Sequence, residues 1–231
     1  MREYEAPDSE VNEGRNGNAE HFDVTQFLKI KRTTLFVKRL FDIIVSTLSL
    51  VVLAVFFLIL AIIIKINSEG PVFYRQTRVG KNGRLFKILK FRTMVIDADK
   101  TGRQITVGAD PRITGAGRFL RKTKMDELPQ IINIVTGDMS FVGPRPEVPK
   151  YVELYTETQR QVLLVRPGIT DTASIEFRNE SDVLARSSDP ERLYVEEIIP
   201  IKLNYNLQYI RSISVLNDIK LILLTVLRII R

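Results

Sequence analysis

The stretch at residues 43–64, IIVSTLSLVVLAVFFLILAIII, decides the fold expected for this chain. It runs for 22 residues without a charged side chain. A helix rises about 1.5 Å per residue, so this segment can cross a hydrocarbon core roughly 30 Å thick. A buried helix of a soluble protein is the competing interpretation, but such helices seldom lack a charged face over this length. The segment therefore predicts a membrane-penetrating helix.

Positive charge flanks the segment on both sides. Lys38 and Arg39 precede it, and residues 65–92 hold eight Lys or Arg against one acid. Because positive residues near a membrane segment tend to stay cytoplasmic, a simple span would force one basic flank across. A re-entrant segment avoids this, but it needs a helix break, and residues 43–64 contain neither proline nor glycine. On the residues alone, a span and a re-entrant hairpin both remain open.

The composition predicts one membrane-attached domain with appendages. Residues 1–23 carry seven acids against two bases and few branched apolar residues, which is typical of a flexible tail. The remainder carries a net charge of about +12, which suits phosphate-bearing partners or an anionic membrane surface. We expect no nucleic-acid partner, because the bases flank an apolar segment. The expected division is 1–34 for the acidic tail and basic approach, 35–66 for the membrane-penetrating helix, and 67–231 for the folded domain.

Several classes of site are excluded. The chain has no cysteine, so disulfides and thiolate metal sites are absent. Its one histidine, His21, lies in the acidic tail, which excludes histidine-based triads. No GxxxxGK[ST] motif occurs, so nucleotide binding of the P-loop kind is not expected.

The segment after residue 70 predicts a mainly α fold with a short β-hairpin. Two strands are expected around Gly80-Lys-Asn-Gly83, an Asn-Gly turn signal. Helices are expected at about 114–120, 123–135 and 150–164, and from Pro190 with Ser188 or Asp189 as its cap. Residues 215–231 are apolar with scattered bases, which indicates an amphipathic helix lying in the membrane interface.

Asp126 and Glu127 are the sharpest candidates for chemistry. They lie between a basic run that includes Arg121 and a proline-flanked Arg145. Carboxylates bind Mg²⁺ and arginines match phosphate oxygens, and phosphoryl transfer needs both. The alternative is structural, because Thr123-Lys-Met-Asp126 fits a capping box and acids are favoured in the first turn of any helix.

Five ordered blocks carry a family resemblance. They are Lys38-Arg-Leu-Phe-Asp42, Lys90-Phe-Arg-Thr-Met94, Asp126-Glu-Leu-Pro-Gln130, residues 137–146 (GDMSFVGPRP) and Arg166-Pro-Gly-Ile-Thr170. Together they resemble the bacterial sugar transferases of the small monotopic phosphoglycosyl transferase family. The resemblance covers the chain from about residue 36 to its end.

The resemblance implies transfer of a sugar 1-phosphate from a nucleoside diphosphate sugar, usually a UDP-sugar, to polyprenol phosphate, with release of UMP. It implies a monotopic protein of the bacterial inner membrane, with its catalytic domain on the cytoplasmic face. Asp126 would be the nucleophile that forms a covalent phosphosugar intermediate, and Glu127 would help it hold Mg²⁺. Arg121 and Arg145 would bind the phosphates, with Lys90 and Arg92 as further candidates.

Three departures from the family pattern stand out. Ala54-Val55 replaces the Ser-Pro that usually breaks the membrane helix, residues 171–180 replace a common sugar-facing block, and Asn206 stands where many members have aspartate. A second class of function therefore stays open, namely a non-catalytic membrane-tethered scaffold or a nucleotide-sugar-binding protein. The sugar, the glycan pathway and the oligomeric state are not predicted.

Overall fold

The computed structural model describes residues 23–98, 110–177 and 180–230, so the acidic tail predicted for residues 1–23 lies outside it apart from Asp23. A short helix, α1 (Val24–Ile30), follows directly. Asp23 caps it by accepting hydrogen bonds from the backbone N–H groups of Thr25 and Gln26. Val24 is buried in the main core, so this part of the predicted basic approach is folded against the domain.

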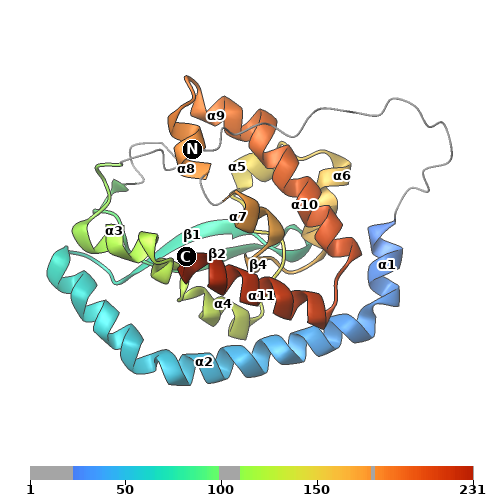
Figure 1. Ribbon diagram of the computed structural model, residues 1–231, viewed down its shortest axis with the longest axis horizontal. Coiled ribbons are helices and arrows are strands. Elements are labelled where there is room, and N and C mark those ends of the chain that lie inside the picture. Colours follow the sequence, from blue (N-terminus) through green and yellow to red (C-terminus); the bar gives the residue numbers. More distant parts are fainter. Residues whose placement is uncertain (1–22, 99–109, 178–179, 231) are drawn as a thin grey trace.

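The apolar segment lies within one helix of 36 residues, α2 (Arg32–Asn67). It passes through Ala54-Val55 without interruption and is bowed along one side of the molecule (Figure 1). By length and composition it could cross a membrane, and within the described residues no other helix meets that test. Only 11 % of its most apolar window is buried, which argues against a core helix of a soluble protein. The re-entrant topology stays a prediction, because the helix has no sharp break.

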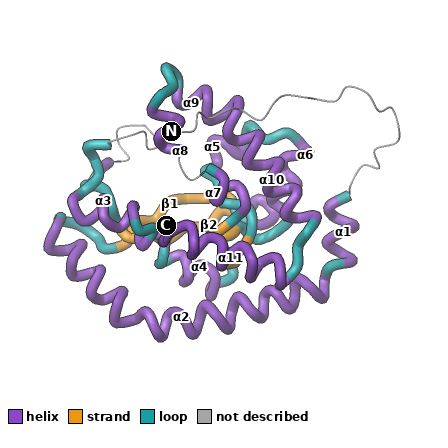
Figure 2. The backbone as a smooth tube through the Cα atoms, viewed as in Figure 1, coloured by secondary structure: helices purple, strands orange, loops and turns teal. Residues whose placement is uncertain are grey.

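The predicted β-hairpin is confirmed. Strands β1 (Phe73–Val79) and β2 (Leu85–Phe91) pair antiparallel, in a register that runs from Phe73 opposite Phe91 to Val79 opposite Leu85. The turn is a single 3-10 turn, η1 (Lys81–Gly83), in which Asn82 adopts a left-handed φ of 56°. A second pair, the parallel strands β3 (Ser140–Val142) and β4 (Gly168–Thr170), was not predicted. The strands lie in the middle of the molecule with helices around them (Figure 2).

Two of the predicted helices are broken. The helix predicted for 123–135 is wrong, because Lys124 takes a left-handed φ of 57° and leaves a short 3-10 turn, η3 (Met125–Glu127), before α4 (Gln130–Thr136). The helix predicted for 150–164 is three pieces: α5 (Pro149–Val152), α6 (Glu157–Arg160) and η4 (Gln161–Leu164). The helix predicted near 114–120 is present as α3 (Gly115–Lys122).

The C-terminal part is helical. It contains α7 (Thr172–Glu176), α8 (Glu180–Ala185), α9 (Pro190–Leu193), the π turn η5 (Tyr194–Ile198), α10 (Ile199–Arg211) and α11 (Val215–Ile230). Asp189 caps α9 and Pro190 is its first residue, as the sequence predicts. The fold class expected from the sequence, mainly α with a small β content, is therefore confirmed.

The core lies between these helices and the second strand pair. Its main cluster joins Val142 on β3 to Leu203 and Ile210 on α10 and Leu221 on α11. The other side of α11 leaves apolar side chains exposed, namely Leu216, Ile219, Leu223, Leu224, Val226 and Leu227. This helix therefore buries one face in the domain and presents a second apolar face outward.

Candidate active site

The two adjacent carboxylates lie on η3 and not in the first turn of a long helix. The Thr123 hydroxyl donates back to the carbonyls of Phe119 (2.9 Å) and Leu120 (3.2 Å) at the end of α3. It therefore does not form the capping box that the sequence allowed, and that structural explanation of Asp126 is wrong. The left-handed residue Lys124 then turns the chain into η3.

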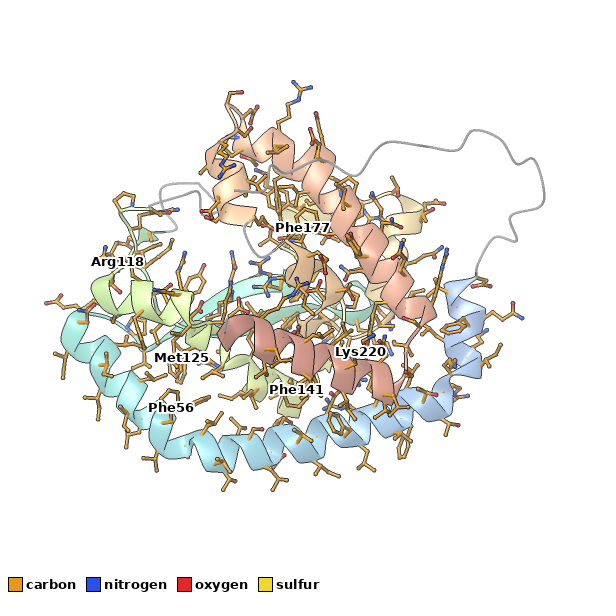
Figure 3. The ribbon with its side chains drawn as sticks, in the orientation of Figure 1. Phe56, Arg118, Met125, Phe141, Phe177 and Lys220 are labelled. Carbon is orange, nitrogen blue, oxygen red and sulfur yellow. The ribbon has the colours of Figure 1, made fainter. Side chains whose placement is uncertain are left out.

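Apolar residues hold this turn in place. Met125 and Leu128, one on each side of the acid pair, pack against a cluster that contains Phe91 and Leu120. Phe56 of α2 belongs to the same cluster, and Figure 3 shows Phe56 and Met125 between α2 and η3. The turn is thus anchored to α2, and Asp126 itself is only 8 % exposed.

Glu127 is held by two cations. Lys90, near the end of β2, donates to Glu127 Oε1 at 2.8 Å. Arg145 binds the same carboxylate with both terminal nitrogens, Nη1 to Oε2 at 3.2 Å and Nη2 to Oε1. Burial alone would raise the pKa of Glu127, but Arg145 and Lys90 outweigh it and hold that pKa well below its ordinary value. Glu127 is therefore a fixed anion.

Asp126 differs from its neighbour. Its Oδ1 atom is buried and accepts no hydrogen bond from any residue that the structure describes. Burial raises the pKa of Asp126, and the positive charge of Lys90 only partly offsets that effect. A buried carboxylate oxygen without a partner is costly unless a ligand, an ion or a reacting atom comes to it.

Arg145 is positioned by a tightly packed loop. The Gly143 and Gly168 backbones approach so closely that a Cβ on Gly143 would lie 2.4 Å from the Arg166 carbonyl oxygen. Backbone hydrogen bonds add to this contact, from Gly143 N to the Thr170 carbonyl (3.1 Å) and from Gly168 N to the Pro144 carbonyl (3.0 Å). The unpredicted β3–β4 pair thus fixes the arginine.

Two predicted arginines lie differently. Arg121 donates from Nε to the Thr93 hydroxyl at 2.9 Å, and its charge acts on Asp126. Arg92 instead donates from Nη2 to the Ser68 carbonyl (2.7 Å) and hydroxyl (2.9 Å) at the end of α2. The structure therefore brings Lys90, Asp126, Glu127, Arg145 and Arg121 to one site, and it places Arg92 at the C-terminal end of α2.

The sequence interpretation missed two supporting networks. Glu147 accepts hydrogen bonds from Arg78 (2.8 Å) and from the Tyr194 hydroxyl (2.6 Å), which ties the loop after Arg145 to β1 and η5. The position of Glu147, directly after Pro-Arg-Pro, was the available signal.

The second network is buried and connects α2 to β3. Lys38 pairs with Asp218, and Asp218 also accepts from the Tyr209 hydroxyl at 2.7 Å. Asp42 accepts from the backbone N–H of Phe141 at 3.2 Å. No sequence signal links Lys38 to Asp218, because 180 residues separate them.

The acid pair offers a partial metal site. The structure describes no group of three or more His, Cys, Asp or Glu side chains able to hold an ion. Asp126 Oδ1 has an open coordination position, whereas both oxygens of Glu127 are already bound by Lys90 and Arg145. Mg²⁺ is often held by one or two carboxylates plus substrate phosphates, so these residues fit a cation that the substrate helps to bind.

Two acids of the block that departs from the family pattern, Asp171 and Glu180, act electrostatically on Arg145. Asp171 caps α7 through the Ser174 N–H at 2.9 Å, and Glu180 pairs with Lys202 at 2.7 Å. The pKa of Arg145 is raised above its ordinary value. The negative charge of Glu127 contributes most to this, and the charges of Asp171 and Glu180 contribute less. Asn206 is buried with an unpartnered Oδ1, and nothing in the structure explains this residue.

Comparison with known proteins identifies the family. Residues 33–231 match the family model described as bacterial sugar transferase. The chain is 41 % identical over 196 residues to the UDP-glucose:undecaprenyl-phosphate glucose-1-phosphate transferase of Escherichia coli (strain K12), covering 83 % of this chain and 39 % of that protein.

Two further relatives show the same similarity. The chain is 38 % identical over 201 residues to the exopolysaccharide production protein PSS of Rhizobium leguminosarum bv. phaseoli, covering 83 % of this chain and 94 % of that protein. It is 34 % identical over 194 residues to an N-acetylgalactosaminephosphotransferase of Aeromonas hydrophila, covering 83 % of this chain and 43 % of that protein. The chain spans about two-fifths of the length of several relatives that it matches. The match over residues 33–231 nevertheless places this chain in the bacterial sugar transferase family.

Proposed function

We propose that this protein transfers a sugar 1-phosphate from a UDP-sugar to polyprenol phosphate and releases UMP. The observation that carries the proposal is the pairing of Asp126, with its unpartnered buried Oδ1, and Glu127, fixed as an anion by Lys90 and Arg145. The E. coli relative is named for the same type of transfer to undecaprenyl phosphate. The reaction would begin the assembly of a membrane-bound glycan such as an exopolysaccharide, capsule, O-antigen or glycoprotein glycan.

The chemistry proceeds in two displacements. An Asp126 oxygen attacks the sugar-bearing phosphorus of the donor, the bond from that phosphorus to the bridging oxygen breaks, and UMP leaves with the electron pair. An oxygen of polyprenol phosphate then attacks the same phosphorus. The Asp126 carboxylate leaves, and polyprenyl diphosphate sugar is formed.

The surrounding cations make the first attack possible. An anionic carboxylate must approach an anionic phosphorus, so positive charge has to offset the repulsion. Arg121, Arg145 and Lys90 are placed to bind the diphosphate oxygens, and Glu127 keeps Arg145 and Lys90 in position. Asp126, whose Oδ1 is open, would hold Mg²⁺ with Glu127 adding its negative charge nearby, and the ion would supply further neutralisation when bound. Arg92 donates from Nη2 to Ser68, and we assign it no role in this step.

The docking of α2 supports a monotopic topology. Lys38 near one end of α2 pairs with Asp218, and Asn67 at the other end accepts from the Ala116 N–H at 3.0 Å. Both contacts are to the same folded body, whereas a true span would separate the ends by roughly 30 Å of hydrocarbon. We therefore place α2 in one leaflet with its exposed apolar side toward lipid, and the catalytic domain on the cytoplasmic face of the bacterial inner membrane. Labelling a residue introduced before Lys38 from outside intact cells tests this placement, because accessibility there would mean a span.

UMP release tests the activity. Purified protein in nanodiscs should release UMP from at least one member of a UDP-sugar panel, given polyprenol phosphate and Mg²⁺. Asp126→Asn should abolish release, whereas the matched control Asp182→Asn, at an exposed acid, should retain it. Donor without acceptor should produce a phosphosugar adduct in the intact mass of the wild type, and none in Asp126→Asn. Donor binding without release or adduct would instead support a nucleotide-sugar-binding protein.

A further inference from the structure

A second polar cavity lies away from the acid pair, at the tip of the β-hairpin. Its volume is about 220 Å³, and it is lined by Gly80, Lys81, Asn82, Arg84, Phe86, Gly137, Asp138 and Arg166. Phe86 is the lining residue on β2, and Lys90, which contacts Glu127, follows it by four residues, roughly 13 Å of extended strand. The hairpin-tip cavity is therefore distinct from the site of phosphoryl transfer.

The lining of the hairpin-tip cavity is strongly positive. Three cations line the cavity without forming an ion pair with any described residue: Lys81, Arg84 and Arg166. Burial and the positive charge of Arg166 both lower the pKa of Lys81. Asp138 is the one acid in the lining, and its Oδ2 accepts from the Thr136 hydroxyl at 2.9 Å. Three cations that face one cavity repel one another, and a bound anion would relieve that repulsion.

Helix capping explains only part of this charge. Arg166 donates from Nε to the Gly137 carbonyl at 2.9 Å, and Arg39 donates to the Ile134 carbonyl at 2.8 Å, so both arginines satisfy the C-terminus of α4. Lys81 and Arg84 make no such side-chain contact with the described residues. Their position beside Arg166 therefore needs a different reason.

The surroundings of the cavity are those expected at the depth of lipid head groups. Arg39 belongs to α2, directly before the apolar segment, and reaches the Val135 carbonyl at 3.3 Å. Exposed apolar side chains adjoin the cations along the chain: Leu40 beside Arg39 is 49 % exposed and Leu85 beside Arg84 is 58 % exposed. Basic and exposed apolar residues in one patch are typical of a membrane interface.

We infer that the hairpin-tip cavity binds the phosphate of an anionic bilayer phospholipid through Lys81, Arg84 and Arg166. We distinguish this lipid from the reacting polyprenol phosphate, because Lys90, which binds Glu127 beside Asp126, lies at the opposite end of β2 from Lys81 and Arg84. The inference rests on the proposed function only in that α2 lies in the bilayer. The bound lipid would hold the hairpin, and through it Lys90, at a fixed height above the membrane.

Lipid retention tests the inference without using activity. The protein is exchanged into nanodiscs of phosphatidylcholine with a titrated fraction of phosphatidylglycerol, and the lipid retained after extraction is counted by native mass spectrometry. The double variant Lys81→Ala/Arg84→Ala should bind phosphatidylglycerol at least about tenfold more weakly than the wild type. The control Arg186→Ala/Arg192→Ala removes the same charge from two exposed positions, one directly after α8 and one on α9, and should bind as the wild type does.

Three results would overturn the inference. An equal loss in the control would mean that net charge alone attracts the lipid. Displacement of the lipid by millimolar inorganic phosphate would mean a site for free anions. If the Lys81→Ala/Arg84→Ala variant retained phosphatidylglycerol as the wild type does, with an equal thermal midpoint, the cavity would not be a lipid site. If UMP release fails while retention follows the expected pattern, the proposed function is wrong and the lipid site stands.

Discussion

The two halves of α2 dock on the same body by different chemistry. The N-terminal half uses buried polar groups, with Lys38 paired to Asp218 and Asp42 bonded to the Phe141 N–H. The C-terminal half uses apolar contacts, in which Leu60 and Ile64 pack against Phe91 and Leu120. One helix therefore carries a directional attachment and a non-directional one.

The difference matters because of what each half touches. Phe141 and Val142 belong to β3, and Arg145 follows three residues after Val142. Hydrogen bonds fix position and orientation, whereas apolar packing fixes proximity. The polar half of α2 is thus suited to set the position of Arg145, and the apolar half to keep η3 packed against α2.

Breaking the Lys38–Asp218 pair should have the largest effect on the free energy of unfolding. Asp218→Ala leaves the buried ammonium of Lys38 without its partner and removes the 2.7 Å acceptor of the Tyr209 hydroxyl. We expect a loss of about 4 kcal/mol in the free energy of unfolding. Denaturant unfolding of the detergent-solubilised protein measures it.

A double variant separates charge from packing at this position. Lys38→Met/Asp218→Leu removes both charges and should recover most of the loss, because replacing a buried ion pair by apolar residues is often neutral. A double variant as unstable as Asp218→Ala would mean that packing, and not the unpaired charge, causes the loss.

Breaking the apolar attachment should cost somewhat less. Ile64 is 1 % exposed, so Ile64→Ala removes buried methyl groups and leaves a cavity, at a cost of about 3 kcal/mol. Ile62, two residues earlier and 50 % exposed, is the matched control and should cost under about 1 kcal/mol in detergent. Equal losses at the two positions would show that the C-terminal half is not docked on the domain.

A third change tests whether the polar half positions Arg145. Asp42→Ala removes the acceptor of the Phe141 N–H and should cost about 1–2 kcal/mol. Because β3 would then be less well fixed, we also expect kcat for UMP release to fall about three- to tenfold. Asn67→Ala breaks a comparable bond at the other end of α2, to the Ala116 N–H, and should change stability but not kcat. A drop in kcat for both variants would count against a special role of the polar half.

The long apolar helix and the hairpin could be predicted because their signals are local. Twenty-two uncharged residues and an Asn-Gly turn need no distant partner to be recognised. The residues of the acid pair could also be named from the sequence, but their environment could not. Whether Thr123 caps a helix or ends one depends on the left-handed conformation of Lys124, and that conformation is fixed by tertiary packing.

The remaining features depend on contacts between distant segments. The pairing of β3 with β4 joins residues 140 and 168, and each strand has only three residues, too few for a periodic pattern. The position of Arg92 also depends on a distant segment, although the sequence places Arg92 only two residues after Lys90. In the folded chain these two side chains point to different partners, Ser68 and Glu127.

The smallest expected effect is a difference between the two halves of α2 in how their contribution to the free energy of unfolding depends on pH. Burial raises the pKa of Asp218 above its ordinary 3.8, and Lys38 only partly offsets it. The folded state therefore binds this proton more tightly than the unfolded chain does. The contribution of Asp218 to stability is greatest below about pH 3.8 and declines as the pH rises through the raised pKa.

Unfolding free energies measured between pH 4 and 7 check the sign. The stability of the wild type relative to Asp218→Asn should decrease as the pH rises, because the asparagine cannot titrate. Ile64→Ala should follow the wild-type curve at a constant offset, since the apolar half contains no group that ionises in this range. If the stability of the wild type relative to Asp218→Asn instead increased with pH, the charge of Lys38 would have a larger effect on the pKa of Asp218 than burial has. The ionised Lys38–Asp218 pair would then stabilise the fold. In that case the attachment of α2 beside Arg145 would be strongest at neutral pH, where the proposed reaction takes place.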